Sequence, residues 1–451
     1  MIANLIEFSR ELEKVNEWWL TKAVIEEELY PFKRALFSKL TDALPGRRIM
    51  LLLGPRRTGK SVLLKQMIAS LLSSGIEPAS ILYYSLDDPS LAAYSDNLIK
   101  DLIDYHAENI VSGKKRYIFL DEVQSFPGWH KWIKTFYDRN PSIKFILSGS
   151  ASITLQNEAN QFLRGRTFEL SLFPLDLNEF LALSGQRQSY SSLEDLLKLT
   201  PIEISTMGKK IMPLFKEYAL VGGFPEWFQA KPFGIEAWFN SLISDVPKKS
   251  IYEDIAKLYG IKSPRMLELI LTFIISHQSQ ILAYETINEA VGLDRATLVN
   301  YIEFLKSSYL LIDILKFAKI KEQLKAKKKF LAVDQGLRNA ILKDYKIQEE
   351  NIGFIIENMV GIKCSQAAGQ GVYYWRNNGE IDFILKGQAV SPLEVKYKNQ
   401  IKKEDLSSIL FFLNKMKLPK GMVITKDLFQ KKTIDNKQII FVPAWLFLLA
   451  E

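Results

Sequence analysis

Eight consecutive residues combine two glycines, a lysine and a serine in a spacing that suits phosphate binding. They are Gly54, Pro55, Arg56, Arg57, Thr58, Gly59, Lys60 and Ser61, and they match the pattern G-x-x-x-x-G-K-[ST]. The glycines allow a tight turn whose N–H groups converge on a β-phosphate at a helix N-terminus. Lys60 would then reach the β- and γ-phosphates, and the Ser61 hydroxyl would ligate Mg²⁺. The pattern predicts a site for ATP and Mg²⁺, with Arg56 and Arg57 facing either phosphate or another domain.

The segments on either side of these eight residues are those that such a loop requires. An apolar run, Ile49 to Leu53, is typical of a buried parallel strand, and a helical pattern begins at Val62. A second apolar run, Tyr117 to Leu120, ends in Asp121 and Glu122. The carboxyl end of this strand would open at the nucleotide. We therefore expect Asp121 to hold the water shell of Mg²⁺ and Glu122 to polarise the attacking water.

Two further segments carry candidates for contacts with the γ-phosphate. A strand expected over Lys144 to Leu147 is followed by Ser148, which would lie between the water and the γ-phosphate. Ser150 is the alternative, and a simple turn is the other interpretation of this segment. Arg166, or Arg164, would act as an arginine finger toward the nucleotide of a neighbouring subunit, which requires a homo-oligomer. A surface ion pair is the competing interpretation for these arginines.

The composition is that of a globular protein in a reducing compartment. Hydrophobic residues make up 47% and charged residues 24% of the 451 residues, which places the chain among ordinary folded proteins. The single cysteine, Cys364, excludes an internal disulfide. Glu7, Glu11 and Glu13 are atypical of a signal peptide, and no run approaches the ~18 apolar residues of a transmembrane helix. We therefore expect a cytoplasmic protein without membrane contact.

The region after residue 260 has the element order of a winged helix. Three amphipathic segments precede two short β-runs, and Asp294 is placed to cap the third segment. The segments are Ser263–Ile275, Tyr284–Val291 and Arg295–Ser307, and the β-runs are Leu310–Phe317 and Lys329–Val333. The residues of the third segment expected to face outward are Arg295, Thr297, Asn300 and Lys306.

The loop between the two β-runs is strongly basic. Between Ala318 and Phe330 it has one acidic residue, Glu322, against six lysines: Lys319, Lys321, Lys325, Lys327, Lys328 and Lys329. As the wing, this loop would contact DNA phosphates. A solvated loop and a protein interface are the alternatives, and Glu303 on the third segment weakens the case for DNA.

A second group of charged residues lies near the end of the chain. Asp382 is on one expected strand, and Glu394 and Lys396 are on the next, in a helix, three strands, helix, strand order. An Asp followed by Glu-x-Lys can collect two carboxylates around Mg²⁺, with the lysine beside the attacking water. Because side chains alternate along a strand, Glu394 and Lys396 share one face. This arrangement predicts metal-dependent cleavage of a phosphodiester.

Several motifs together resemble a family of bacterial and archaeal ATP-binding proteins. In that family an AAA-type P-loop module precedes a winged helix and a C-terminal domain similar to PD-(D/E)xK nucleases. The motifs are GPRRTGKS from Gly54, YIFLDEVQ from Tyr117, LSGS from Leu147, LRGR from Leu163, GGFPE from Gly222, FLAVDQGLRNAIL from Phe330, IIEN from Ile355, YYWRNNGEIDFIL from Tyr373 and LEVKYK from Leu393. The resemblance implies an ATPase of the additional-strand type with Glu122 as catalytic base. It also implies that Glu357, Asp382 and Glu394 hold a metal ion beside Lys396.

These expectations combine into one α/β architecture. The expected domains are an N-terminal helical segment (1–46), a P-loop ATPase core with a parallel sheet (47–175), a helical lid (176–260), a winged helix (261–330) and a restriction-endonuclease-like domain of αβββαβ order (331–451). The expected function is a Mg²⁺-dependent ATPase whose nucleotide cycle controls a DNA-interacting nuclease-like domain. The alternative is an ATP-dependent switch with a binding module for DNA or a protein partner that does not cleave.

Overall fold

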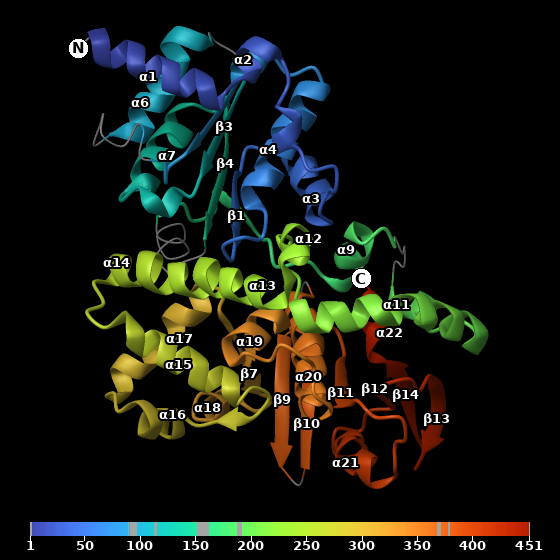
Figure 1. The fold of residues 1–451 in the computed structure, drawn as a ribbon. Helices are drawn as coiled ribbons and strands as arrows, with labels where there is room; N and C mark the ends of the chain where they lie inside the picture. The colour runs from blue at the N-terminus through green and yellow to red at the C-terminus, as the bar shows by residue number, and fades with distance from the viewer. Residues whose placement is uncertain are drawn as a thin grey trace. The chain divides into compact units, whose positions relative to one another are not determined.

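The computed structural model describes residues 2–88, 90, 97–111, 115–150, 162–186, 192–367, 371–377 and 379–450. The chain divides into two compact units, Met1–Phe173 and Pro174–Glu451 (Figure 1). Within the described ranges, no helix is both long enough and apolar enough to cross a membrane.

A parallel sheet forms the centre of the first unit. In the described residues it has five strands in the order β2-β3-β4-β1-β5. They are β1 (Ile49–Gly54), β2 (Ile81–Ser85), β3 (Arg116–Asp121), β4 (Ile143–Ser150) and β5 (Thr167–Ser171). β1 is buried along its whole length, as its continuous apolar run predicts, and α4 (Lys60–Ser73) packs on β1 and β4. Because β4 pairs with both β1 and β3, it lies between them in the sheet.

The N-terminal helices cover the open edge of this sheet at β2. After α1 (Ile2–Val15), the buried amide of Asn16 donates to the carbonyl oxygen of Tyr83 and accepts from its N–H, at 2.9 and 2.7 Å. The indoles of Trp18 and Trp19 both donate to the carbonyl of Ile81. These side chains satisfy backbone groups that a further strand would otherwise pair, so the edge is closed against other chains.

The second unit begins with helices and continues into a mixed sheet. The helices before residue 260 include α9 (Leu177–Leu183), α11 (Pro201–Val221), α13 (Gly234–Ile243) and α14 (Ala256–Tyr259). The sheet has nine strands among the described residues, in the order β13-β14-β12-β11-β10-β9-β7-β8-β6. They are β6 (Ile281–Leu282), β7 (Leu311–Lys316), β8 (Lys328–Ala332), β9 (Gly371–Asn377), β10 (Gly379–Lys386), β11 (Val390–Lys396), β12 (Lys420–Thr425), β13 (Gln430–Ile434) and β14 (Lys437–Pro443).

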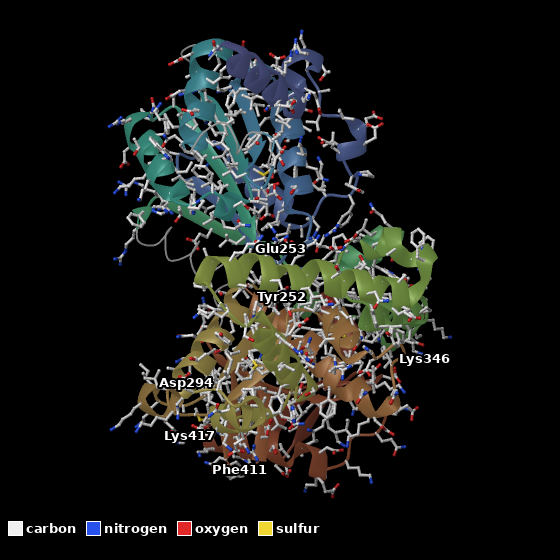
Figure 2. All side chains as sticks on the ribbon, turned by 60° about the vertical axis from the view of Figure 1, so that its left-hand side comes forward. Tyr252, Glu253, Asp294, Lys346, Phe411 and Lys417 are labelled. Carbon is white, nitrogen blue, oxygen red and sulfur yellow. The ribbon has the colours of Figure 1, made fainter. Side chains whose placement is uncertain are left out.

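Three helices and the β7–β8 hairpin occupy the region expected as a winged helix. α15 (Pro264–Ser276), α16 (Tyr284–Val291) and α17 (Arg295–Ser307) follow one another, and Asp294, labelled in Figure 2, caps α17 by accepting from the N–H of Thr297 at 3.0 Å. The hairpin is not separate from the strands that follow, because β7 pairs in parallel with β9. The expected boundary between residues 330 and 331 therefore falls inside β8 of a continuous sheet.

The last part of the chain shows the expected helix, three strands, helix, strand order. α20 (Glu349–Gln366) precedes β9, β10 and β11, and α21 (Ser407–Lys415) precedes β12. α20 lies close on the sheet at Gly361, where an added Cβ would be 2.4 Å from the Leu331 side chain of β8 and 2.7 Å from the ring of Phe383 in β10. This close contact brings α20 side chains next to β8 and β10.

The Gly222–Gly223 pair ends α11 and contacts the start of α19 (Gln335–Leu342). Gly222 has φ 82°, and the N–H of Gly223 donates to the Asp334 carboxylate at 2.8 Å. Asp334 also caps α19 by accepting from the N–H of Leu337 at 3.0 Å. Burial raises the pKa of Asp334 to about 6 although backbone N–H groups oppose the shift. Two motifs far apart in sequence thus form one buried junction, and the glycine pair is a helix stop with a packing role.

Candidate functional site

The phosphate-binding motif lies between β1 and α4 in the first unit. Gly54 has φ 151°, and a Cβ there would be 2.1 Å from the carbonyl oxygen of Leu172. Gly59 has φ 91° and immediately precedes α4, so the helix begins at the end of the loop. Backbone N–H groups at this helix N-terminus are left without intrahelical partners, as an anion-binding loop requires.

Lys60 is the first residue of α4, and its side chain extends back over the loop. The ammonium donates to the carbonyl oxygens of Gly54 and Pro55 at 3.1 and 3.0 Å, and it lies 3.8 Å from Glu122 Oε1. Lys60 is buried, with 4% of its surface exposed, whereas Ser61 is exposed and Val62 is half-buried. The positive charge is therefore already held at the loop that is expected to bind phosphate.

Residues outside the motif hold the loop in shape. Arg34 donates from its two terminal nitrogens to the carbonyl oxygens of Thr58, at 3.0 Å, and Phe173, at 2.8 Å. The Thr58 hydroxyl donates within the loop to the carbonyl of Pro55 at 3.0 Å. Arg57 is exposed and has φ 65°, a conformation that non-glycine residues seldom adopt. Arg34 was not expected at the site, and no sequence pattern links it to the loop.

Asp121 ends β3 in a buried position next to the motif. Its carboxylate accepts from the hydroxyl of Tyr83 at 3.1 Å and from the hydroxyl of Ser148. Burial, together with the charge of Glu122, raises the pKa of Asp121 above its usual value, although the hydroxyls of Ser148 and Ser61 oppose the shift. The two residues expected to ligate Mg²⁺, Ser61 and Asp121, therefore lie near each other.

Glu122 is held in one orientation beside Lys60. Its backbone has φ 50°, a strained conformation of the kind found at functional sites. The side-chain amide of Gln124 donates to Glu122 Oε2 and, at 2.8 Å, to the Ser150 hydroxyl, while the N–H of Ser150 lies 3.3 Å from the same Oε2. Burial acts to raise the pKa of Glu122, but the Lys60 charge, the Gln124 hydrogen bond and the Arg56 charge outweigh it and hold that pKa below its usual value. The carboxylate is ionised at neutral pH, as a general base requires.

The two expected γ-phosphate contacts differ in their outcome. Ser148 is at the site, because its hydroxyl contacts Asp121 and lies 3.3 Å from the N–H of Glu122. Arg166 is not at the site of its own chain. Its carbonyl accepts from Ile49, the first residue of β1, so it lies at the opposite end of the strand from Gly54, and its guanidinium forms a two-pronged ion pair with Asp138 at 2.9 and 3.2 Å. A finger role toward a neighbouring subunit stays a prediction.

The residues of this site fit a magnesium-bound nucleotide. A hydroxyl and a buried carboxylate, Ser61 and Asp121, lie near each other beside a lysine and a helix N-terminus. Mg²⁺ prefers oxygen ligands, and in nucleotide sites it takes few from the protein and the others from phosphate and water. Two oxygen-bearing side chains are therefore sufficient here, and Lys60 supplies charge for the phosphates.

The residues of the second expected site, near the end of the chain, also lie close together, but they surround a lysine. The four side chains expected there are Glu357 from α20, Asp382 from β10, and Glu394 and Lys396 from β11. Asp382 lies where the β9–β10 register shifts between Ile381 and Ile384, a bulge that re-aims its side chain. The N–H of Val395 donates to Asp382 at 2.8 Å, and Lys396 donates to Glu394 at 2.6 Å. We call Glu357, Asp382 and Glu394 the carboxylate cluster.

A lysine that was expected on the exposed wing points into this cluster. Lys329, in β8, has no exposed surface, and its ammonium forms ion pairs with Glu357, with Asp382 at 3.3 Å and with Glu380 at 3.7 Å. It also lies 5.3 Å from the centre of the Phe383 ring. Burial acts to lower the pKa of Lys329, but the charges of Glu357 and Asp382 outweigh it and raise that pKa. Lys329 is therefore a charged member of the site.

The carboxylate cluster does not fit a metal ion as it is arranged. Over the described residues, no three His, Cys, Asp or Glu side chains are grouped so that they could hold one. Burial, then the charge of Asp382, raises the pKa of Glu357 to about 7 and that of Glu394 to about 8. The expected magnesium site at Glu357, Asp382 and Glu394 is thus not formed, because the Lys329 ammonium lies between Glu357 and Asp382.

The residues expected to contact DNA are partly used within the fold. The ammonium groups of Lys306 and Lys328 both bind Asp313, at 2.9 and 2.8 Å, and Lys306 also binds Glu303 at 2.9 Å. Arg295 pairs with Glu285 at 2.7 Å on the surface. Four lysines of the loop remain exposed, and none of them has an acidic partner among the described residues: Lys319, Lys321, Lys325 and Lys327.

Comparison with protein families divides the chain into three matched regions. Residues 46–181 match the AAA domain family. Residues 212–346 match a domain of unknown function, DUF8612, and residues 352–447 match another, DUF4143.

Proteins similar over most of the chain occur in bacteria and archaea. An uncharacterized protein of Haemophilus influenzae is 25% identical over 440 residues, which is 95% of this chain and 100% of that protein. Uncharacterized protein MJ1544 of Methanocaldococcus jannaschii is 24% identical over 417 residues, covering 88% and 87% of the two chains. Among solved structures, PCH-2 of C. elegans matches 43% of this chain and 52% of its own, with 17% identity and a TM-score of 0.26. The loop geometry and the match over residues 46–181 support a nucleotide-binding P-loop domain of the AAA type in the first part of the chain.

Proposed function

We propose that this protein is a Mg²⁺-dependent ATPase whose nucleotide cycle switches a partner-binding second unit that does not cleave nucleic acid. The observation that supports ATPase activity is the Lys60–Glu122 pair at the phosphate-binding loop, next to the buried Asp121 at the end of β3. A hydroxyl, a carboxylate, an ammonium and a second, ionised carboxylate are the four groups that hydrolysis of a nucleoside triphosphate needs.

Each group has a separate task in the proposed reaction. Lys60 exchanges the carbonyl oxygens of Gly54 and Pro55 for phosphate oxygens when ATP binds. Bound Mg²⁺ would supply charge neutralisation on the phosphates. Glu122 then accepts a proton from the attacking water, and Gln124 keeps its carboxylate turned toward that water. Ser148 is the candidate for sensing the γ-phosphate, and Arg166 acts only if a second subunit presents it to the nucleotide.

ATP binding and hydrolysis in two variants test the ATPase half. Lys60→Ala should abolish ATP binding, because it removes the buried ammonium at the loop. Glu122→Gln should retain ATP binding but stop turnover, so that ATP stays bound. Lys131→Ala, an exposed lysine of α7 (Trp129–Arg139), is the matched control and should behave as wild type. Unchanged ATP hydrolysis in both Lys60→Ala and Glu122→Gln would contradict the proposal.

DNA is the proposed partner of the second unit, and four exposed lysines support it. Lys319, Lys321, Lys325 and Lys327 lie between β7 and β8 and have no acidic partner in the described chain. Each lysine that contacts a phosphate contributes about one unit to the slope of log affinity against log salt. Replacing the four by alanine should therefore lower this slope, measured by fluorescence anisotropy with labelled duplex DNA. An unchanged slope would exclude this loop from DNA and favour a protein partner.

The absence of cleavage is proposed because Lys329 lies within the carboxylate cluster. Plasmid and branched DNA incubated with Mg²⁺ or Mn²⁺, with and without ATP, should stay intact. Asp382→Ala is the control for contaminating nucleases. Cutting by the wild type that is lost in Asp382→Ala would replace this proposal with that of an ATP-regulated nuclease.

A further inference from the structure

The carboxylate cluster contains more acidic groups than a protein interior normally holds. Glu394 is buried, the Glu357 side chain is only 13% exposed, and Asp382 lies close enough to raise the pKa of both. An unpaired carboxylate is unfavourable in such a place, so buried acidic groups take up protons or are paired with counter-charges or a metal ion. Raised pKa values neutralise part of this group, and a cation is needed for the carboxylates that stay ionised when the protein folds.

Lys329 is built into the fold at the point where that charge is needed. Its ammonium is within 4 Å of Glu357, Asp382 and Glu380, which come from two different elements, α20 and β10. The preceding residue, Lys328, instead pairs with Asp313 in β7, because neighbouring side chains of a strand point to opposite faces. Pairing of β8 with β7 thus fixes which of the two lysines enters the cluster.

Lys396 supplies a second positive charge to the cluster and is paired with Glu394. It donates to Glu394 Oε1 at 2.6 Å, while the second oxygen of Glu394 is buried and has no hydrogen-bond partner. That second oxygen and the nearby Asp382 are groups that could ligate a cation if Lys329 were removed. The cluster therefore has the chemistry of a metal site but already contains its positive charge.

We propose that the Lys329 ammonium is the resident cation of the carboxylate cluster, occupying the place that a divalent metal ion would otherwise take. The cluster then ties β8 to α20 and β10 as a closed ion-pair network. The native second unit takes up no divalent metal there, and without the ammonium the carboxylates are expected to close around a divalent cation. The inference rests on the proposal that the second unit does not cleave nucleic acid, and it does not depend on ATP hydrolysis.

The test measures Mn²⁺ binding to the full chain without nucleotide, by electron paramagnetic resonance of free Mn²⁺. Wild type and the Asp382→Asn variant should bind the same amount of Mn²⁺, because no Mn²⁺ occupies the cluster in either. Lys329→Met, which keeps the length of the side chain but not its charge, should gain one Mn²⁺ per chain and a higher melting temperature with Mn²⁺. Adding Asp382→Asn to Lys329→Met should weaken that binding at least ~10-fold. Lys328→Met is the matched control and should gain no site.

Two results would overturn the inference. One is Mn²⁺ binding by wild type that is lost in Asp382→Asn, and the other is a folded Lys329→Met that gains no Mn²⁺ site. If Lys329→Met does not fold, the double variant Lys329→Met/Asp382→Asn decides. Recovered folding, seen by circular dichroism, supports charge neutralisation as the role of Lys329, and continued failure contradicts it. A nucleotide-free assay keeps these outcomes separate from any failure of the ATPase.

Discussion

Replacing Gln124 by alanine should slow ATP hydrolysis without weakening ATP binding. The Gln124 amide donates to Glu122 Oε2 and to the Ser150 hydroxyl, so it fixes the carboxylate that is proposed to activate water. A hydrogen bond to a charged group is worth about 1.5–3 kcal/mol, which corresponds to about a 10- to 150-fold change in rate. Glu122 would keep the Ser150 N–H and the Lys60 charge. We therefore expect a loss near the lower end of that range.

The same substitution should also change the pH dependence of the reaction. The Gln124 hydrogen bond helps to hold the pKa of Glu122 below its usual value, although burial opposes this. Losing the bond raises that pKa, so the carboxylate is protonated at a higher pH and the acidic limb of the kcat profile moves upward. Steady-state hydrolysis measured over about pH 4 to 8 reports this limb.

A second amide in the same unit provides the control for Gln124→Ala. Gln66 is buried and donates to the carbonyl oxygens of Tyr30 and Phe32, away from Glu122. Gln66→Ala should lower the melting temperature but leave the acidic limb in place. If Gln124→Ala leaves both kcat and the acidic limb unchanged, Gln124 does not position the base.

Two further predictions concern the junction between α11 and α19. The folded protein binds the Asp334 proton more tightly than the unfolded chain, since burial raises that pKa from 3.8 to about 6. Its contribution to the free energy of unfolding is thus full below about pH 4 and falls as the pH rises toward about 6. Asp334→Asn should remove this trend from urea unfolding curves, and an identical trend would contradict the assignment. Gly336→Ala should destabilise by about 1–3 kcal/mol or more, because its Cβ would lie 2.0 Å from the Val221 carbonyl oxygen. Gly353→Ala, with nothing within 4 Å, should instead be neutral or stabilise by about 0.5–1 kcal/mol, and equal losses in both would refute the steric argument.

The nucleotide site could be predicted because its parts are local in sequence. A buried strand, a glycine-rich turn and a helix start are contiguous from Ile49 to Val62, so the motif defines its own geometry. Asp121 and Glu122 could be added because the carboxyl ends of parallel strands meet at one edge of a sheet. Gln124 lies only two residues beyond Glu122, so its place at this edge of the sheet could also have been predicted, but no motif marks it.

The position of Arg166, the continuity of the second sheet and the burial of Lys329 could not be predicted, because each depends on pairing between strands that are far apart in the chain. Arg166 directly precedes β5 at the end of the sheet opposite Gly54, which the LRGR motif alone does not indicate. The parallel pairing of β7 with β9 joins the helical region to the C-terminal strands in one sheet. From the sequence alone, Lys329 is one of six lysines in a basic run. Only the register of β8 against β7 turns it inward toward Glu357 and Asp382, because a shift of one residue exchanges the two faces of a strand.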